Sequence, residues 1–186
     1  MSKPFKLGLV VGRFQVFHTG HEQMIRKAIE TCEKTLIFIG SSQESLTQKN
    51  PLSYELRKVI ISEIFWEEIF DGVLRIRPLK DIGAGNNQEW GEYVLASAKI
   101  ETGFYPDLLV SGKEDRRLSW FDCGHNISEL FIPKAINISA SQMRESIIKN
   151  DFEFWKQYTN PKLWNKFEKM RNIILISQKN IITESL

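Results

Sequence analysis

Cysteine is scarce in this sequence, and long apolar runs are absent from it. The two cysteines, Cys32 and Cys123, lie far apart and form neither a CxxC pair nor a disulfide framework, so we expect a reducing, cytoplasmic setting. The apolar stretch after Met1 is too short for a signal peptide, and no later segment is long and apolar enough to cross a bilayer. We therefore expect neither a disulfide-rich secreted protein nor an integral membrane protein.

The sequence also lacks an excess of charge of either sign. Lys and Arg number 25, Asp and Glu number 23, and the net charge is +2. Such a balance predicts no nucleic-acid partner and no membrane surface as partner, so any anion must be bound by a few well-placed groups. A chain of 186 residues with 42% apolar side chains has the size and composition of one globular domain.

Short apolar runs alternate with amphipathic segments along the chain. We predict strands at 5–11, 35–40, 72–79, 107–111 and 129–132, and helices at 21–33, 53–66, 88–101 and 139–150. One or two aromatic-bearing helices and a tail are expected after residue 150. This alternation predicts an α/β fold, with a mostly parallel sheet covered by helices on both faces.

Polar loops follow four of the predicted strands. They cover residues 12–20, 41–50, 81–87 and 112–117. In a parallel sheet the carboxyl ends of the strands meet at one edge, where ligands collect near the switch point of strand order. The candidate functional residues lie in these loops or at the helix starts after them.

The first loop, GRFQVFHTGH, carries two of the three histidines of the chain, His18 and His21. A helix start offers free backbone N–H groups to a phosphate, and histidine side chains there can donate to phosphate oxygens. Two other interpretations stay open at this point. The histidines could be metal ligands, although no third ligand lies nearby and the HExxH pattern is absent, or they could be structural.

A second polar cluster, ISASQMR, lies far along the chain. Ser139 and Ser141 flank a predicted helix start and could hold an anion, and Arg144 can point to the same side. An ordinary serine cap beside a solvated arginine explains this cluster equally simply, and it is the better interpretation of the cluster taken alone.

Together the two clusters resemble the paired HxGH and ISxTxxR motifs of a nucleotidyltransferase superfamily. Within it the chain is most similar to the archaeal-type nicotinamide mononucleotide (NMN) adenylyltransferases, which also occur as the synthetase half of Nudix-fused enzymes. Three more stretches carry the resemblance, which spans residues 7 to about 165. They are GSSQESLTQKNPLSYELR (40–57), similar to GSxQxSxTxxNPFTxxER, then DIGAGNNQEWGEYV (81–94) and DFEFWKQY (151–158).

The resemblance implies a Rossmann-like nucleotidyltransferase core over residues 1–150 and a C-terminal helical extension over 151–186, packed together as one domain. The chain departs from the family pattern at several positions. Val16 stands where proline is frequent, Ser141 replaces threonine, Leu56 replaces glutamate, and Gly83 replaces asparagine in a loop about two residues longer than the pattern.

The implied reaction joins the adenylyl group of ATP to NMN and releases pyrophosphate, without a covalent enzyme intermediate. The resemblance assigns catalysis to His18, His21, Arg13 and Arg144, which would donate to the phosphates or neutralise their charge. It assigns ATP binding to Gly12, Phe14, Gln15, Gly20, Gly112, Ile138, Ser139 and Ser141. Mg²⁺ would come with the triphosphate, since the chain offers no carboxylate cage as a metal site of its own.

For NMN, the resemblance implies Arg57 as the phosphate ligand, Asp81 and Asn87 as contacts to the amide or ribose, and Trp90 as the residue stacked on the nicotinamide ring. Without the resemblance, Trp90 would be read as a core tryptophan. The alternatives are a nicotinate mononucleotide adenylyltransferase, another nucleotidyltransferase of the HxGH type and, less favoured, a non-catalytic nucleotide sensor. The family also suggests a homo-oligomer.

Overall fold

Parallel strands form one sheet in the computed structural model, which describes residues 2–83, 87–112, 126–133 and 137–184. In chain order the strands are β1 (Phe5–Gly12), β2 (Cys32–Ile39), β3 (Leu74–Pro78), β4 (Leu108–Ser111) and β5 (Ser128–Phe131). They lie side by side in the order β3-β2-β1-β4-β5. The chain therefore builds outward from β1 on one side, then returns to its other side, which puts the switch point between β1 and β4. The predicted α/β fold is confirmed.

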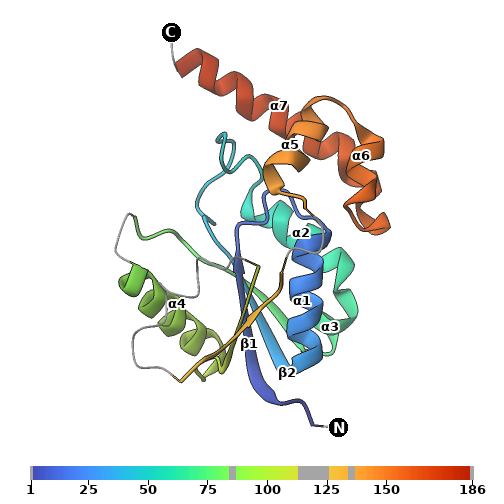
Figure 1. Cartoon of the computed structure of the whole chain (residues 1–186). Helices are drawn as coiled ribbons and strands as arrows, with labels where there is room; N and C mark the ends of the chain where they lie inside the picture. Colours follow the sequence, from blue (N-terminus) through green and yellow to red (C-terminus); the bar gives the residue numbers. More distant parts are fainter. Residues whose placement is uncertain (1, 84–86, 113–125, 134–136, 185–186) are drawn as a thin grey trace.

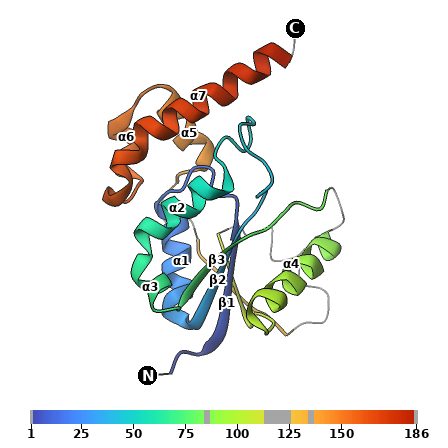
Figure 2. The ribbon, with the colours of Figure 1, turned by 180° about the vertical axis from the view of Figure 1, so that it is seen from behind.

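Helices cover both faces of the sheet, as Figures 1 and 2 show. One face carries α1 (Thr19–Thr31), α2 (Tyr54–Ile64) and α3 (Trp66–Phe70), and the other carries α4 (Asn87–Thr102). Successive residues of a strand point to opposite faces. Accordingly Val10 packs with the α1 and α2 side chains, whereas its neighbours Leu9 and Val11 pack with Val94 and Ala98 of α4.

The C-terminal elements lie beyond the carboxyl ends of the strands (Figure 1). They are α5 (Ala140–Ile148), α6 (Phe152–Gln157), the 3₁₀ helix η2 (Pro161–Lys166) and α7 (Phe167–Glu184). Trp155, Phe167 and Met170 are buried in the same apolar cluster as the α1 and α2 side chains. The predicted helical extension is thus present, and the domain boundary at residue 150 stays a prediction.

Several predicted boundaries were wrong for identifiable reasons. Helix α1 begins at Thr19, two residues before the predicted start, because the His18 side chain caps it. It ends at Thr31 because Cys32 already pairs with Phe5 in the sheet. The predicted helix at 53–66 is divided into α2 and α3 at Phe65, whose backbone leaves the helical region at φ −113° and ψ 33°.

The predicted C-terminal tail was also wrong. Helix α7 continues to Glu184, so the segment after Ile173 is helical up to that residue. None of the helices in the described ranges is long and apolar enough to cross a membrane.

Candidate active site

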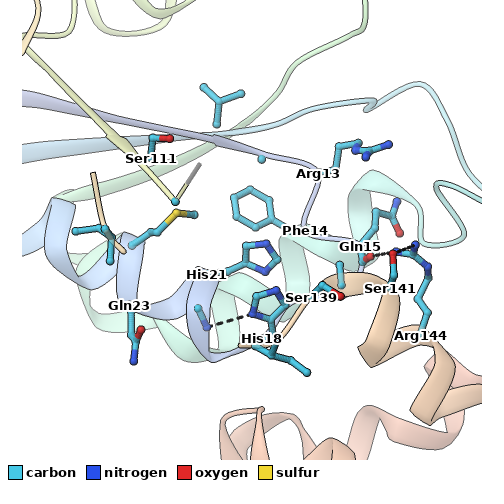
Figure 3. A pocket seen from close by; sticks show the side chains of 18 of the residues that line it. Arg13, Phe14, Gln15, His18, His21, Gln23, Ser111, Ser139, Ser141 and Arg144 are labelled. Carbon is cyan, nitrogen blue, oxygen red and sulfur yellow. Dashed lines mark hydrogen bonds between the residues drawn. The ribbon is translucent and has the colours of Figure 1, made fainter. Parts of the chain in front are cut away.

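A pocket of about 310 Å³ opens at the carboxyl ends of β1 and β4, beside the starts of α1 and α5 (Figure 3). It lies at the switch point of the sheet, where α/β folds commonly bind ligands. The structure brings both sequence clusters to this pocket. Its walls include Gly12, Arg13, Phe14, Gln15, His18, Gly20, His21, Lys49, Gly112, Ile138, Ser139, Ser141 and Arg144.

His18 occupies the N-cap of α1 and is buried, with 7% of its surface exposed. Its Nδ1 accepts a hydrogen bond from the Gly20 N–H at 3.1 Å. A ring nitrogen that accepts is unprotonated, so Nε2 carries the proton in the neutral ring. The helix cap therefore fixes the tautomer and makes Nε2 the donor of this side chain.

His21 lies one turn further along α1 and stacks on His18, with ring centroids 3.9 Å apart. Its other neighbours are Phe14, in an edge contact at 5.1 Å, and Phe17 at 5.6 Å. Both phenylalanines are buried. The ring of His21 is thus packed against two buried phenylalanine rings, which limit its movement.

The glycines of the first motif make room for side chains of the protein itself. A Cβ atom at Gly20 would lie 3.0 Å from Cε1 of His18, and one at Gly12 would lie 2.9 Å from the Phe14 ring. We expected these glycines to admit the nucleotide. The structure gives them a second task, since a larger residue at either position would displace the ring packed against it.

Gln15, which was predicted to contact ATP, lines the pocket, but its side-chain amide is bonded to the protein itself. Its side chain is 3% exposed, and its amide forms two hydrogen bonds with the backbone of Leu52, donating to the carbonyl at 2.7 Å and accepting from the N–H at 2.9 Å. Both polar atoms of the amide are therefore engaged with Leu52. The carbonyl of Gln15 accepts a hydrogen bond from Nη1 of Arg144.

The second motif forms the opposite wall. Ser139 caps α5 by accepting from the Gln142 N–H at 3.2 Å, and the Gln142 side chain accepts from the Ser139 N–H in return. Ser141 is exposed, and its hydroxyl accepts from Nη2 of Arg144 at 3.1 Å. The serine cap expected from the sequence is confirmed, and it leaves the Ser141 hydroxyl at the pocket surface.

The pocket is cationic. Burial lowers the pKa of Arg144, and the nearby charge of Arg13 lowers it further. Within the part of the chain that the structure describes, neither arginine forms an ion pair with a carboxylate, and no Asp or Glu lines the pocket. Repulsion between the two guanidinium groups would be relieved by a bound anion.

Lys49 is a site residue that the sequence reasoning missed. It is exposed, lines the pocket, and also lines a second cavity between the 41–51 loop, α5 and α7. It lies just before Asn50-Pro51, inside the stretch that resembles the family. The resemblance of this stretch to the family could have drawn attention to Lys49. However, the sequence of a polar loop does not show whether a lysine side chain points toward the site or toward solvent.

Arg57 was expected to bind the NMN phosphate, and the structure places it in the interior of the fold. The side chain is only 1% exposed and does not line the pocket. Its guanidinium donates to four backbone carbonyls, those of Arg13, Gly40, Ser41 and Ser53, at 2.8–3.2 Å. Burial lowers its pKa to about 10, so it stays protonated at neutral pH. Arg57 ties the ends of β1 and β2 to the start of α2.

The remaining residues assigned to NMN do not line this pocket either. Asp81 follows β3, its carboxylate accepts a hydrogen bond from the Ser41 hydroxyl at 2.6 Å, and its backbone N–H donates to Oε1 of Gln43 at 3.1 Å. Trp90 packs on the core under α4 with Tyr93, at 5.5 Å between ring centroids. Asn87 is the first residue of α4, and its side chain lies outside the described residues. Their roles stay predictions.

The side chains that line the pocket fit a metal ion only if a phosphate chain is bound with it. Among the described residues, no group of three His, Cys, Asp or Glu side chains could hold a metal. The hydroxyl of Ser141 is at the surface of the pocket, and none of the described residues that line the pocket carries a carboxylate. Mg²⁺ prefers oxygen ligands and keeps several waters, so it fits here if nucleotide phosphates supply most of its ligands.

The chain is similar to a known family and to several named proteins. Residues 9–114 match the cytidylyltransferase-like family. The nicotinamide-nucleotide adenylyltransferase of Saccharolobus solfataricus is 33% identical over 149 residues, which are 77% of this chain and 80% of that protein. The nicotinamide/nicotinic acid mononucleotide adenylyltransferase of Acinetobacter baylyi is 33% identical over 108 residues, covering 56% of this chain and 55% of the relative.

A solved structure shares the fold. The bifunctional NMN adenylyltransferase/ADP ribose pyrophosphatase of Francisella tularensis superposes with a TM-score of 0.80 at 24% identity. The match covers 97% of this chain, which spans about half the length of the Francisella chain, at 55%. Because the family match covers more than half of the chain and the Saccharolobus relative is 33% identical over 77% of it, the chain belongs to the cytidylyltransferase-like family and, within it, to the nicotinamide-nucleotide adenylyltransferases.

Proposed function

We propose that the protein transfers the adenylyl group of ATP to NMN and so forms NAD and pyrophosphate. The observation that carries this proposal is the pocket itself, which two stacked histidines and two arginines line and to which the described residues contribute no Asp or Glu. Such a site suits a substrate with several negative charges. The Saccharolobus relative, which bears the name of this activity, supports the choice of ATP and NMN.

The proposed step is a direct in-line displacement. A phosphate oxygen of NMN attacks the α-phosphorus of ATP, a new P–O bond forms, and the bond to the β-phosphate oxygen breaks as its electron pair leaves with pyrophosphate. Both reacting groups are anions, so the protein contributes mainly by positioning and charge neutralisation. The Nε2–H of His18 and the ring of His21 would donate to the phosphate oxygens on which charge accumulates.

The β- and γ-phosphates would lie against the α5 side of the pocket. Arg144, the Ser141 hydroxyl and Lys49 are the donors there, and Arg13 faces them across the opening. Mg²⁺, bound with ATP, would neutralise part of the triphosphate charge. The protein groups would then hold the leaving group in line with the attacking oxygen.

Nicotinate mononucleotide is the second candidate acceptor. The Acinetobacter relative carries both acceptors in its name, which is the observation that favours keeping this candidate. Nicotinate differs from nicotinamide by a carboxylate in place of an amide, and an enzyme distinguishes the two through the few side chains that contact this substituent. Asp81 and Trp90 are our candidates for these side chains. The carboxylate of Asp81 would disfavour the nicotinate form, because two carboxylates repel each other.

The decisive experiment measures pyrophosphate release with ATP and Mg²⁺, with NMN and nicotinate mononucleotide in parallel and the product identified by mass. Fast turnover with NMN supports the proposal. A clear preference for nicotinate mononucleotide keeps the chemistry and overturns the assigned acceptor. ATP binding without turnover on either acceptor points to another acceptor or to a nucleotide sensor.

Two further proposals concern setting and assembly. We propose a cytoplasmic protein, since Cys32 is a free thiol and the substrates are metabolites of that compartment. We also propose a homo-oligomer, supported by large apolar side chains that are mostly exposed on α3 and α4, namely Phe70 at 82% and Ile100 at 84%. Light scattering on the purified protein tests the assembly.

A further inference from the structure

The side-chain amide of Gln15 forms the same two hydrogen bonds with a backbone residue that a second backbone would form in a β-sheet. Its amide nitrogen donates to the Leu52 carbonyl at 2.7 Å, and its amide oxygen accepts from the Leu52 N–H at 2.9 Å. Gln15 is 3% exposed and Leu52 is fully buried. Both polar groups of one buried peptide residue are thus satisfied by one side chain, which ties the loop after β1 to the end of the 41–52 loop.

The backbone of Gln15 faces the other way. Its carbonyl accepts from Nη1 of Arg144, and Nη2 of the same guanidinium donates to the Ser141 hydroxyl. Because Arg144 has no carboxylate partner among the described residues, this carbonyl is a main anchor of its charged group. Gln15 therefore connects Arg144 on α5 with Leu52 in the second loop.

The consequence concerns the orientation of the arginine. The position of the Arg144 guanidinium depends on the direction of the Gln15 carbonyl to which it donates. That direction depends in turn on the Gln15 side chain, whose amide nitrogen and oxygen are both hydrogen-bonded to Leu52. Arginines held by a carboxylate have part of their charge neutralised. Anchoring by a carbonyl instead holds the Arg144 fork in place and leaves its full positive charge for an anion in the pocket.

We propose that Gln15 is a positioning residue for Arg144, which orients the guanidinium toward the triphosphate through the hydrogen bonds between its side chain and Leu52. This inference rests on the proposed function only in so far as it takes ATP to be the anion in the pocket. In this proposal the side-chain amide of Gln15, which is hydrogen-bonded to Leu52, acts through Arg144 and not by contact with the substrate. Its loss should therefore weaken ATP binding only when Arg144 is present to be oriented.

A double-mutant cycle on ATP affinity tests this. The variants are Gln15→Met, which keeps the length of the side chain without its amide, Arg144→Ala, and the two together, each titrated calorimetrically with ATP and Mg²⁺ in the absence of NMN. We expect Gln15→Met to raise the Kd for ATP by about tenfold in the parent protein and by less than about twofold beside Arg144→Ala. Gln157→Met, on the exposed face of α6, is the matched control and should leave the Kd unchanged.

Two results would overturn the inference. An equal loss of affinity with and without Arg144 would mean that Gln15 supports the fold in general, and an unchanged Kd would mean that Arg144 does not depend on it. If Gln15→Met does not fold, Gln15→Asn, which keeps an amide but is one methylene shorter, takes its place in the cycle. Since the readout is ATP binding alone, a failure of NMN turnover leaves this test separate from the proposed function.

Discussion

The imidazole rings of His18 and His21 lie face to face, with centroids 3.9 Å apart and planes inclined by 30°. This stack places both rings at the start of α1, where the N–H groups of the first turn and the positive end of the helix dipole also favour an anion. The position depends on the cap that His18 makes with Gly20 and on the phenylalanines below His21. The helix start and the packed histidine rings thus favour binding of a phosphate group at the same position.

Replacing His18 tests its role as a donor. We expect His18→Ala to lower kcat for NAD formation by on the order of 10²–10³, the usual cost of one donor to a developing charge. The same substitution removes the α1 cap, which costs about 1 kcal/mol of stability. Steady-state kinetics and urea unfolding measure the two effects.

His18→Ser separates these effects, since serine is a good helix cap but does not reach as far as an imidazole. Its free energy of unfolding should return toward that of the parent protein while kcat stays low. A serine variant with near-normal turnover would show that the cap, and not the Nε2 donor, is what the reaction requires.

Replacing Arg57 tests whether its side chain stabilises the fold or binds the NMN phosphate. Arg57→Met leaves the buried carbonyls of Gly40 and Ser41 and the part-buried carbonyl of Arg13 without this donor, so we expect a loss of about 2–4 kcal/mol in the free energy of unfolding. Because the loops on both sides of β1 and β2 would shift, kcat/KM should fall for ATP and NMN together. Denaturant titration and kinetics with each substrate varied provide the data.

The Arg57→Lys variant is the companion, because it keeps the charge but can reach fewer carbonyls at once. An intermediate loss of stability is expected for it. If Arg57→Met proved as stable as the parent protein and raised only the KM for NMN, Arg57 would be a phosphate ligand after all.

Lys49 provides a test on the surface. The side chain is exposed, and we expect Lys49→Ala to raise the KM for ATP by about tenfold, through loss of one charge-assisted contact to phosphate, with no change in the unfolding midpoint. The effect should shrink at high salt, where exposed charges are screened. Lys58→Ala on the exposed face of α2 is the control. Equal KM values for both alanine variants would remove Lys49 from the site.

Cys32 predicts a dependence of stability on pH. Burial raises the pKa of its thiol above the ordinary value of 9.0. Above that pH the unfolded chain releases the thiol proton while the folded protein retains it, so stability present below pH 9.0 is lost as the pH rises toward the folded pKa. The slope should be on the order of 1 kcal/mol per pH unit.

The measurement compares the parent protein with Cys32→Ala by denaturant unfolding on both sides of the thiol's ordinary pKa. The alanine variant should lose less stability than the parent protein on the alkaline side. Parallel curves over the whole range would contradict the prediction, because groups other than Cys32 would then account for the alkaline loss.

Much of the fold followed from local patterns. Apolar runs such as FKLGLVV and TLIFI are too short for buried helices and too continuous for half-exposed strands, so they indicate strands buried on both faces. Helix caps at Ser53 and Ser139 were also readable, since a cap depends on a residue and its near neighbours. The interruption at Phe65 was not, because it depends on the burial of that ring in the core.

The sequence by itself determined the alternation of strands and helices, the two motif clusters and the residue types that can face a phosphate. Only the tertiary structure decided which donors remain for a ligand. Arg57 and Gln15 look like binding residues in the sequence, yet both use their side-chain donors on backbone carbonyls of distant loops. Lys49 looks like an ordinary loop lysine and lines the pocket. The reason is physical, since a polar side chain serves either the fold or a ligand according to what surrounds it, and those surroundings exist only once the chain has folded.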